Sequence, residues 1–193
     1  MAKKAGKAFE HEFANSLEVA REELKLWWTR IYDMQDYIGR RCPVCKKRID
    51  VCPHCKSKLP TIGAIPPKRP ADFYAIYLGK VFFFECKSAH NKKYYQTRWV
   101  KDHQIESLLA LDRAGARAYL AINNRSHPRR MKLYILPIQR YLRMRLATQY
   151  KYIKWEDMEK AAVLVAPRIG VGDTAYYEIG RIFKPKPKTI VSV

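Results

Sequence analysis

The sequence predicts a mixed α/β fold in which helices flank a central sheet. Segments with helical and strand periodicity follow one another in the order helix, strand, hairpin, helix, strand, strand, helix. Of the 193 residues, 48% are hydrophobic, which is enough to bury the core of one domain. We therefore expect a single domain over residues 1–193, with a small insertion at 40–59 and a basic tail at 184–193.

The first helix is expected from about Ala5 to Leu24, because apolar residues recur there in steps of three and four. Glu10 borders this apolar stripe, whereas Glu12, Glu18 and Glu23 project farther from it. An acid at the border of a buried face can reach a neighbouring strand, so Glu10 is a candidate ligand for a metal ion or its water. The alternative is an acid favoured at the helix start by the helix dipole.

Further elements follow from the same periodicities. Strands are expected at 26–32, 116–122 and 132–136, helices at 98–114 and 138–147, and a polar loop at 88–93. On the second helix, Gln104 shares a stripe with Leu108 and Leu111. An amide among apolar neighbours needs a partner, and metal-bound water or a phosphate would serve. The last forty or so residues are ambiguous.

A hairpin pattern near the middle of the chain carries the strongest functional signal. Two runs of aromatic and branched residues flank a Leu-Gly-Lys turn. A two-residue turn at 78–79 pairs Asp72 with Glu85, and a turn at 79–80 pairs Asp72 with Lys87. In either register the three side chains share one face of the hairpin, whereas a three-residue turn would break this alignment.

These residues predict a metal-dependent active site. Charge at the end of an apolar strand is costly unless it is paired or bound to metal. Two carboxylates beside a lysine suit Mg²⁺ or Mn²⁺, so we expect Asp72 and Glu85 to hold one or two such ions beside a catalytic Lys87. Cys86 should face the core and offer its backbone carbonyl to the metal. The alternative is two strand-end acids and a surface lysine.

The insertion at 40–59 carries two Cys-x-x-Cys pairs with six residues between them. In a reduced compartment this pattern predicts one structural, tetrahedral Zn²⁺, and two disulfides or a redox pair are the alternatives. The expected ligands are Cys42, Cys45, Cys52 and Cys55. We call this insertion the zinc ribbon.

Basic residues decorate the zinc ribbon and a later loop. Those of the ribbon are Arg40, Arg41, Lys46, Lys47, Arg48, Lys56 and Lys58, and those of the loop are Arg125, Arg129 and Arg130. All are candidates for DNA binding, although the ribbon residues also fit the solvated surface of a stapled loop. The whole chain holds 38 Lys and Arg against 18 Asp and Glu, a net charge of +20. Such an excess attracts a polyanion, and a ribosomal or membrane-surface protein is the rival interpretation.

Three motifs together resemble the RecU-type Holliday junction resolvases of the PD-(D/E)xK nuclease superfamily. They are the Gly-x-x-x-Glu of residues 6–10, the Pro-x-Asp and Glu-x-Lys of residues 70–87, and the Asp-His-Gln-Ile of residues 102–105. The resemblance spans about residues 6–122. It implies a restriction-endonuclease-like sheet, cleavage that leaves a 5′-phosphate, and catalytic roles for Glu10, Asp72, Glu85, Lys87 and Gln104. It also implies that the zinc ribbon plays the part of the stalk in these enzymes.

The expected function is therefore that of a Mg²⁺-dependent endonuclease that resolves four-way DNA junctions by symmetric nicks. A homodimer is expected because two symmetric nicks need two active sites. The sequence shows neither a signal peptide nor an apolar run of about 20 residues that could span a membrane, so a cytoplasmic location is expected. The alternatives are another PD-(D/E)xK nuclease of nicking, repair or restriction type, and a non-catalytic zinc-ribbon protein that binds nucleic acid.

Overall fold

The computed structural model describes residues 2–31, 69–127, 131–149, 151–171 and 174–184. The chain divides into two units, residues 1–30 with 71–193, and residues 31–70. In the second unit, Arg69 donates from Nη1 to the Ile31 carbonyl at 3.3 Å. Among the described helices, none is long and apolar enough to cross a membrane.

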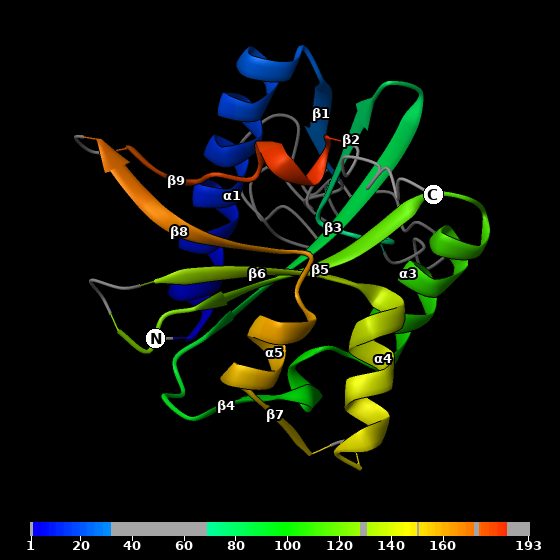
Figure 1. Ribbon diagram of the computed structural model, residues 1–193, viewed down its shortest axis with the longest axis vertical. Coiled ribbons are helices and arrows are strands. Elements are labelled where there is room, and N and C mark those ends of the chain that lie inside the picture. Colours follow the sequence, from blue (N-terminus) through cyan, green and yellow to red (C-terminus); the bar gives the residue numbers. More distant parts are fainter. Residues whose placement is uncertain (1, 32–68, 128–130, 150, 172–173, 185–193) are drawn as a thin grey trace, which may run out of the picture. The chain divides into compact units, whose positions relative to one another are not determined.

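The first unit is built on a mixed seven-stranded sheet with the strand order β1-β2-β3-β5-β6-β8-β9 (Figure 1). Its strands are β1 (Trp27–Arg30), β2 (Phe73–Tyr77), β3 (Lys80–Ala89), β5 (Arg117–Asn124), β6 (Lys132–Pro137), β8 (Leu164–Val171) and β9 (Thr174–Tyr177). The β3–β5 pair is parallel and the other neighbouring pairs are antiparallel. A parallel pair needs a long crossover, which here contains β4 (Tyr94–Gln96), the 3₁₀ turn η1 (Thr97–Trp99) and α3 (Asp102–Arg113).

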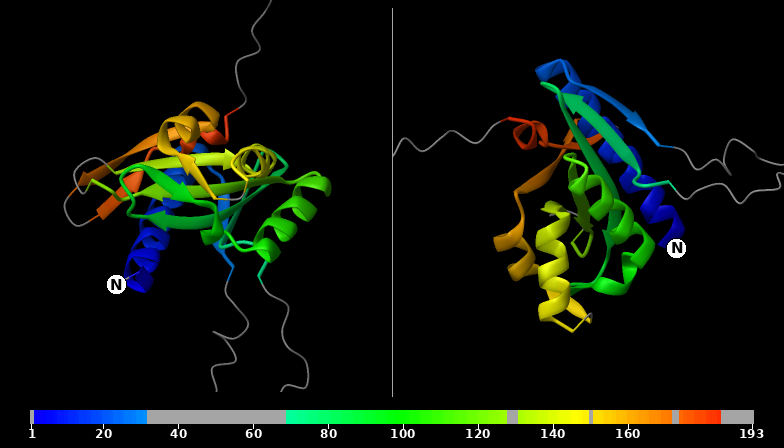
Figure 2. Two further views of the ribbon diagram at one scale, coloured as in Figure 1. Left: turned by 90° about the horizontal axis from the view of Figure 1, so that it is seen from below. Right: turned by 90° about the vertical axis from the view of Figure 1, so that its right-hand side faces the viewer.

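Helices cover both faces of this sheet. On one face, α1 (Ala2–Leu24) buries the apolar stripe of Phe9, Phe13 and Leu17 against β2 and β3. On the other face lie α3, α4 (Ile138–Ala147) and α5 (Trp155–Ala161), and the right-hand view of Figure 2 shows strands between α1 and α4. The central strand β5 is buried along nearly its whole length, as expected of a strand covered on both faces.

The tight turn between β2 and β3 fixes the register of the central hairpin. Leu78 and Gly79 both have positive φ, 48° and 69°, which is the geometry of a type I′ turn. Tyr77 therefore pairs with Lys80, and Phe73 pairs with Phe84. Of the two registers considered from the sequence, the structure has the one with the turn at 78–79.

Several element boundaries differ from the sequence-based predictions: the first helix begins earlier, at Ala2, and the first strand is shorter, Trp27–Arg30. The second helix does not begin at Arg98, because residues 97–99 form a 3₁₀ turn and Lys101 is extended, with ψ 151°. The loop expected from residue 88 begins later, because β3 continues to Ala89 in register with β5.

The region that was ambiguous in sequence completes the fold. After the short η2 turn (Gly180–Ile182), Phe183 packs on Phe82 at 4.8 Å, so the C-terminal segment joins the α1 side of the core. The segment β7 (Tyr152–Lys154) pairs with β4 in a separate two-stranded sheet. The strands β8 and β9 extend the main sheet past β6.

Candidate active site

The central hairpin brings two acids together. The Asp72 amide donates to the Phe84 carbonyl at 3.0 Å, just before the first register pair of the hairpin, Phe73 with Phe84, and this bond ties Asp72 to the residue that precedes Glu85. Both residues are buried, with 1% and 2% of their surface exposed. The Asp72 carboxylate also accepts a hydrogen bond from the Cys86 amide at 2.7 Å on Oδ2, and this contact fixes its orientation.

The Glu85 carboxylate is held by two donors on the same oxygen. Lys87 Nζ lies 2.5 Å from Glu85 Oε1, and Gln104 Nε2 donates to that oxygen as well. The ammonium compensates the buried carboxylate charge, and its own side chain is 18% exposed, so it remains open to solvent. The structure therefore brings Asp72, Glu85, Lys87 and Gln104 into one site.

The start of α3 positions Gln104. Its side-chain Oε1 accepts from the Lys101 amide at 3.1 Å, which is the bond that the N3 side chain supplies in a capping box, and its own amide donates to the Lys101 carbonyl at 3.0 Å. Because Oε1 is used at the helix start, Nε2 points to Glu85. The sequence predicted metal-bound water or a phosphate as the partner of this amide; in the structure the amide donates to the Glu85 carboxylate instead.

Glu10 reaches the same region from α1. Its carboxylate pairs with Arg30 at the end of β1, and the Arg30 guanidinium lies 5.9 Å from the centre of the Phe73 ring. Arg30 was missed in the sequence, where the only signal was a basic residue at the end of an aromatic strand.

The thiol of Cys86 reports how close these acids lie to one another. Burial raises its pKa well above the usual value, and the charges of Asp72, Glu85 and Glu10 raise it further. All three carboxylates thus lie within electrostatic reach of one buried thiol. The prediction that Cys86 faces the core is confirmed, since it packs in the cluster under α1. A metal-ligating role for its carbonyl stays a prediction.

Comparison with known proteins decides the family. The family model described as RecU, Recombination protein U, matches residues 37–173, which is more than half of the chain. The chain belongs to the RecU family. Members of the RecU family are Holliday junction resolvases, nucleases that bind branched DNA and use divalent metal ions. The match covers Asp72, Glu85, Lys87 and Gln104, while Glu10 lies before it.

The chain is also similar to the solved structure of Hjc from Archaeoglobus fulgidus, a Holliday junction resolvase from an archaeal hyperthermophile. That similarity has a TM-score of 0.44 and 15% sequence identity, and it covers 78% of this chain and 92% of that chain. No curated protein matches the chain significantly.

The donor set of this candidate site suits a hard divalent cation. Mg²⁺ is commonly held by one or two carboxylates together with water and substrate phosphates. Asp72, just before β2, and Glu85 on β3 supply two such buried carboxylates. Within the described part of the chain, no group of three or more His, Cys, Asp or Glu side chains is gathered as a metal cage. The site therefore fits an ion that is completed by water and DNA phosphate.

Most of the residues predicted to bind zinc or DNA lie outside the described residues. These are the four cysteines, the seven basic residues of the zinc ribbon, and Arg129 and Arg130. Their roles stay predictions. Arg125 is described, and its side chain is only 12% exposed because its guanidinium faces Glu12.

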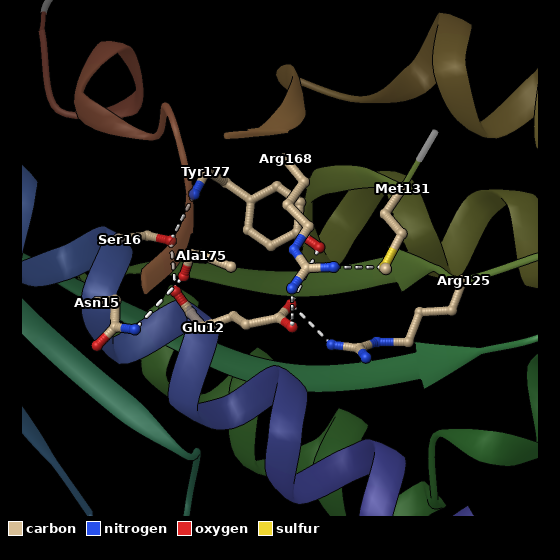
Figure 3. A network of polar contacts seen from close by, with 8 residues as sticks. All are labelled: Glu12, Asn15, Ser16, Arg125, Met131, Arg168, Ala175 and Tyr177. Carbon is tan, nitrogen blue, oxygen red and sulfur yellow. Dashed lines mark hydrogen bonds and ion pairs between the residues drawn. The ribbon is translucent and has the colours of Figure 1, made fainter. Parts of the chain in front are cut away.

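A buried polar network surrounds Glu12 on the α1 side of the sheet (Figure 3). Glu12 is 7% exposed, so the prediction that it projects away from the apolar stripe is wrong. Arg125 Nη2 lies 2.7 Å from its carboxylate and Arg168 Nη2 lies 3.2 Å from it, and the Tyr177 hydroxyl donates to it at 3.3 Å. The strands β8 and β9, which the sequence did not reveal, supply two of these partners. They turn an apparently outward acid into a buried and paired one.

Proposed function

We propose that this RecU-family protein resolves four-way DNA junctions by Mg²⁺-dependent hydrolysis, with one nick in each of two opposed strands. The proposal is carried by one observation, the buried pair Asp72 and Glu85 with Lys87 and Gln104 on one carboxylate oxygen. Mn²⁺ has the same ligand preference and is expected to substitute.

Each residue has a distinct part in this proposal. Asp72 and Glu85 would hold Mg²⁺, which when bound polarises the scissile phosphate and lowers the pKa of an attacking water. Lys87, whose ammonium is fixed by Glu85 and open to solvent, would orient the water or neutralise charge on the phosphate. Gln104 would keep the Glu85 carboxylate in one orientation. Glu10, paired with Arg30, would add an outer carboxylate to the site.

Charge supports the choice of substrate. A net charge of +20 favours a polyanion, and phosphate contacts by Lys and Arg supply most non-specific DNA affinity. In the proposal the zinc ribbon adds a basic projection, held by one structural Zn²⁺ on its four cysteines. Thiolate ligands of this kind persist in a reducing compartment, in keeping with a cytoplasmic protein.

The deciding experiment compares two substrates that share sequence and length. Purified protein is incubated with Mg²⁺ and either a labelled four-way junction or the matched linear duplex, and parallel reactions contain a chelator in place of the metal. We expect paired nicks in the junction, little cutting of the duplex, and no cutting with chelator. Equal cutting of both substrates would show that the protein is a general nuclease. No cutting of either substrate would indicate a protein that binds nucleic acid without cleaving it.

A further inference from the structure

The small β4–β7 sheet has one buried and one open face. Tyr95 and Ile153 pair across it and are 0% and 1% exposed, so they form the buried face. Side chains alternate along a strand, and Tyr94 and Tyr152 therefore belong to the opposite face. Their ring centroids lie 5.2 Å apart at 41°, and Tyr152 remains 46% exposed.

This open face lines a cavity of about 860 Å³ with a positive charge balance. Besides the two tyrosines, the lining contains one carboxylate, that of Glu156. Its basic side chains are Lys93, Arg98, Lys151 and Lys154. Four cations around two adjacent aromatic rings suit a ligand that is both anionic and flat.

The floor of the cavity is firmly packed. Tyr95 lies against Trp99 and Trp155, with ring centroids 5.2 Å and 6.0 Å away. The Trp155 indole donates to the Asn91 carbonyl at 2.8 Å, and the Thr97 amide donates to the Lys151 carbonyl at 3.3 Å. A fixed floor keeps the tyrosine rings in place before any ligand arrives, which lowers the entropy lost on binding.

The cavity is built on the same stretch of chain as the active site. The strand β4 follows β3, which carries Glu85 and Lys87, and precedes α3, which carries Gln104. Burial raises the pKa of Tyr95, on the inner side of β4, well above its usual value, and the charges of Tyr141 and Glu85 raise it further. A ligand on the outer side of β4 would therefore be bound by an element that lies, along the chain, between two elements of the candidate active site.

We propose that this cavity binds an unpaired nucleotide of branched DNA, with its base stacked on Tyr152 and Tyr94 and its phosphates on the basic side chains. A duplex presents phosphates and base edges to a surface, whereas a base face becomes available for stacking only when the base leaves the duplex. The branch point of a junction is a source of such bases. The inference rests on the proposed function, which supplies branched DNA as the substrate. It adds that the protein recognises an unpaired base of that substrate.

The test separates stacking from charge with two variants of one exposed residue. Tyr152→Leu removes the ring, and Tyr152→Phe keeps it. Binding of fluorescein-labelled oligo(dT) and of a linear duplex is measured by fluorescence anisotropy without divalent metal. We expect Tyr152→Leu to weaken oligo(dT) binding by about tenfold, as loss of one stacked base does, and to leave duplex binding unchanged. Tyr152→Phe should bind both like the wild type.

Two outcomes would overturn the inference. One is equal behaviour of the Leu and Phe variants, and the other is a loss of duplex affinity as large as the loss for oligo(dT). Tyr94→Leu provides a second variant of the same ring pair, and thermal unfolding checks that each variant folds. Since this assay involves no cleavage, its failure leaves the junction assay untouched. If the wild-type protein cuts no junction, the proposed function is wrong.

Discussion

Glu85 is the single residue on which most of the site depends. Its Oε1 receives both the Lys87 ammonium and the Gln104 amide, while Asp72, just before β2, accepts from the amide of the next residue, Cys86. A carboxylate buried to 98% needs such compensation, because an isolated charge in the interior is strongly disfavoured. The Lys87 ammonium and the Gln104 amide therefore keep the Glu85 carboxylate ionised and oriented before a metal ion binds to it.

Replacing either acid with its amide should abolish cleavage and preserve DNA binding. Asp72→Asn and Glu85→Gln keep the side-chain shape but lose the charge that holds Mg²⁺, whereas phosphate contacts elsewhere remain. Cleavage and junction affinity are measured side by side, with Glu22→Gln on the exposed surface of α1 as a charge-matched control. Near wild-type cutting by either variant would show that the site is misassigned. Lys87→Ala should also be inactive and should still bind metal, because it leaves both carboxylates in place.

Loss of the Gln104 amide should weaken metal use without abolishing it. Gln104→Ala frees the Glu85 carboxylate to turn, and outer contacts of this kind typically change metal affinity or activity about 10–100-fold. Excess Mg²⁺ should restore part of the lost rate. The control is Gln139→Ala on α4, an exposed residue whose amide donates to Asp112 at 3.0 Å. A Gln104→Ala enzyme with wild-type dependence on Mg²⁺ concentration would contradict the orienting role.

At the scale of elements, the β2–β3 turn determines which residues meet. If the register slipped by one residue, Asp72 would lie beside a different residue of β3. The side chains of β3 that now share a face with those of β2 would then point to the opposite face. The type I′ turn at Leu78 and Gly79 prevents this, although a leucine with φ of 48° is unfavourable. The chain thus keeps a locally strained residue at the point that sets the register of its acids.

Relieving that strain should stabilise the protein. Leu78→Asn replaces a leucine that is 74% exposed with a residue that tolerates positive φ, so we expect a gain of about 1 kcal/mol. For a chain of this size, such a gain raises Tm by about 2–4 °C. The matched control is Leu146→Asn in helix α4, which is 49% exposed and should give no gain. Equal effects of the two substitutions on Tm would argue against strain at the turn.

The zinc ribbon should carry one Zn²⁺ per chain, bound by four cysteines. Metal binding and local folding are coupled, so Cys45→Ser should release the metal and unfold the ribbon, while the nuclease core stays folded. Cys86→Ala serves as the control, because Cys86 packs in the core under α1 and should not affect zinc content. Elemental analysis of protein purified without added metal measures the stoichiometry, and a zinc-free protein would end this hypothesis.

Across the whole molecule, local patterns predicted the first half of the fold better than the second. The apolar stripe of α1 and the alternation of β2 and β3 are strong periodic signals, and they led to the acids at Asp72 and Glu85. The strands β8 and β9 lack such a signal, since their outer residues are mostly exposed or half-buried. Arg30 and Glu12 gained their roles from partners distant in sequence, which no local pattern encodes.

The protein should act as a homodimer that prefers four-way junctions. A junction has two-fold symmetry, and one active site per chain cannot make two symmetric nicks in one binding event, so a two-fold dimer is the simplest solution. Phosphate contacts from both subunits should make binding fall steeply with salt. Light scattering at working concentration measures the oligomeric state, and competition with excess linear duplex measures the preference for junctions.

A mixed dimer gives the sharpest form of this prediction. If each subunit cuts one strand, a dimer of one wild-type and one Asp72→Asn subunit should nick a junction once and leave it unresolved. Mixing the two proteins in rising proportion should therefore lower the yield of resolved product faster than the yield of single nicks. A monomer in light scattering, or paired nicks that fall only in proportion to the wild-type fraction, would exclude cooperation between two subunits on one junction.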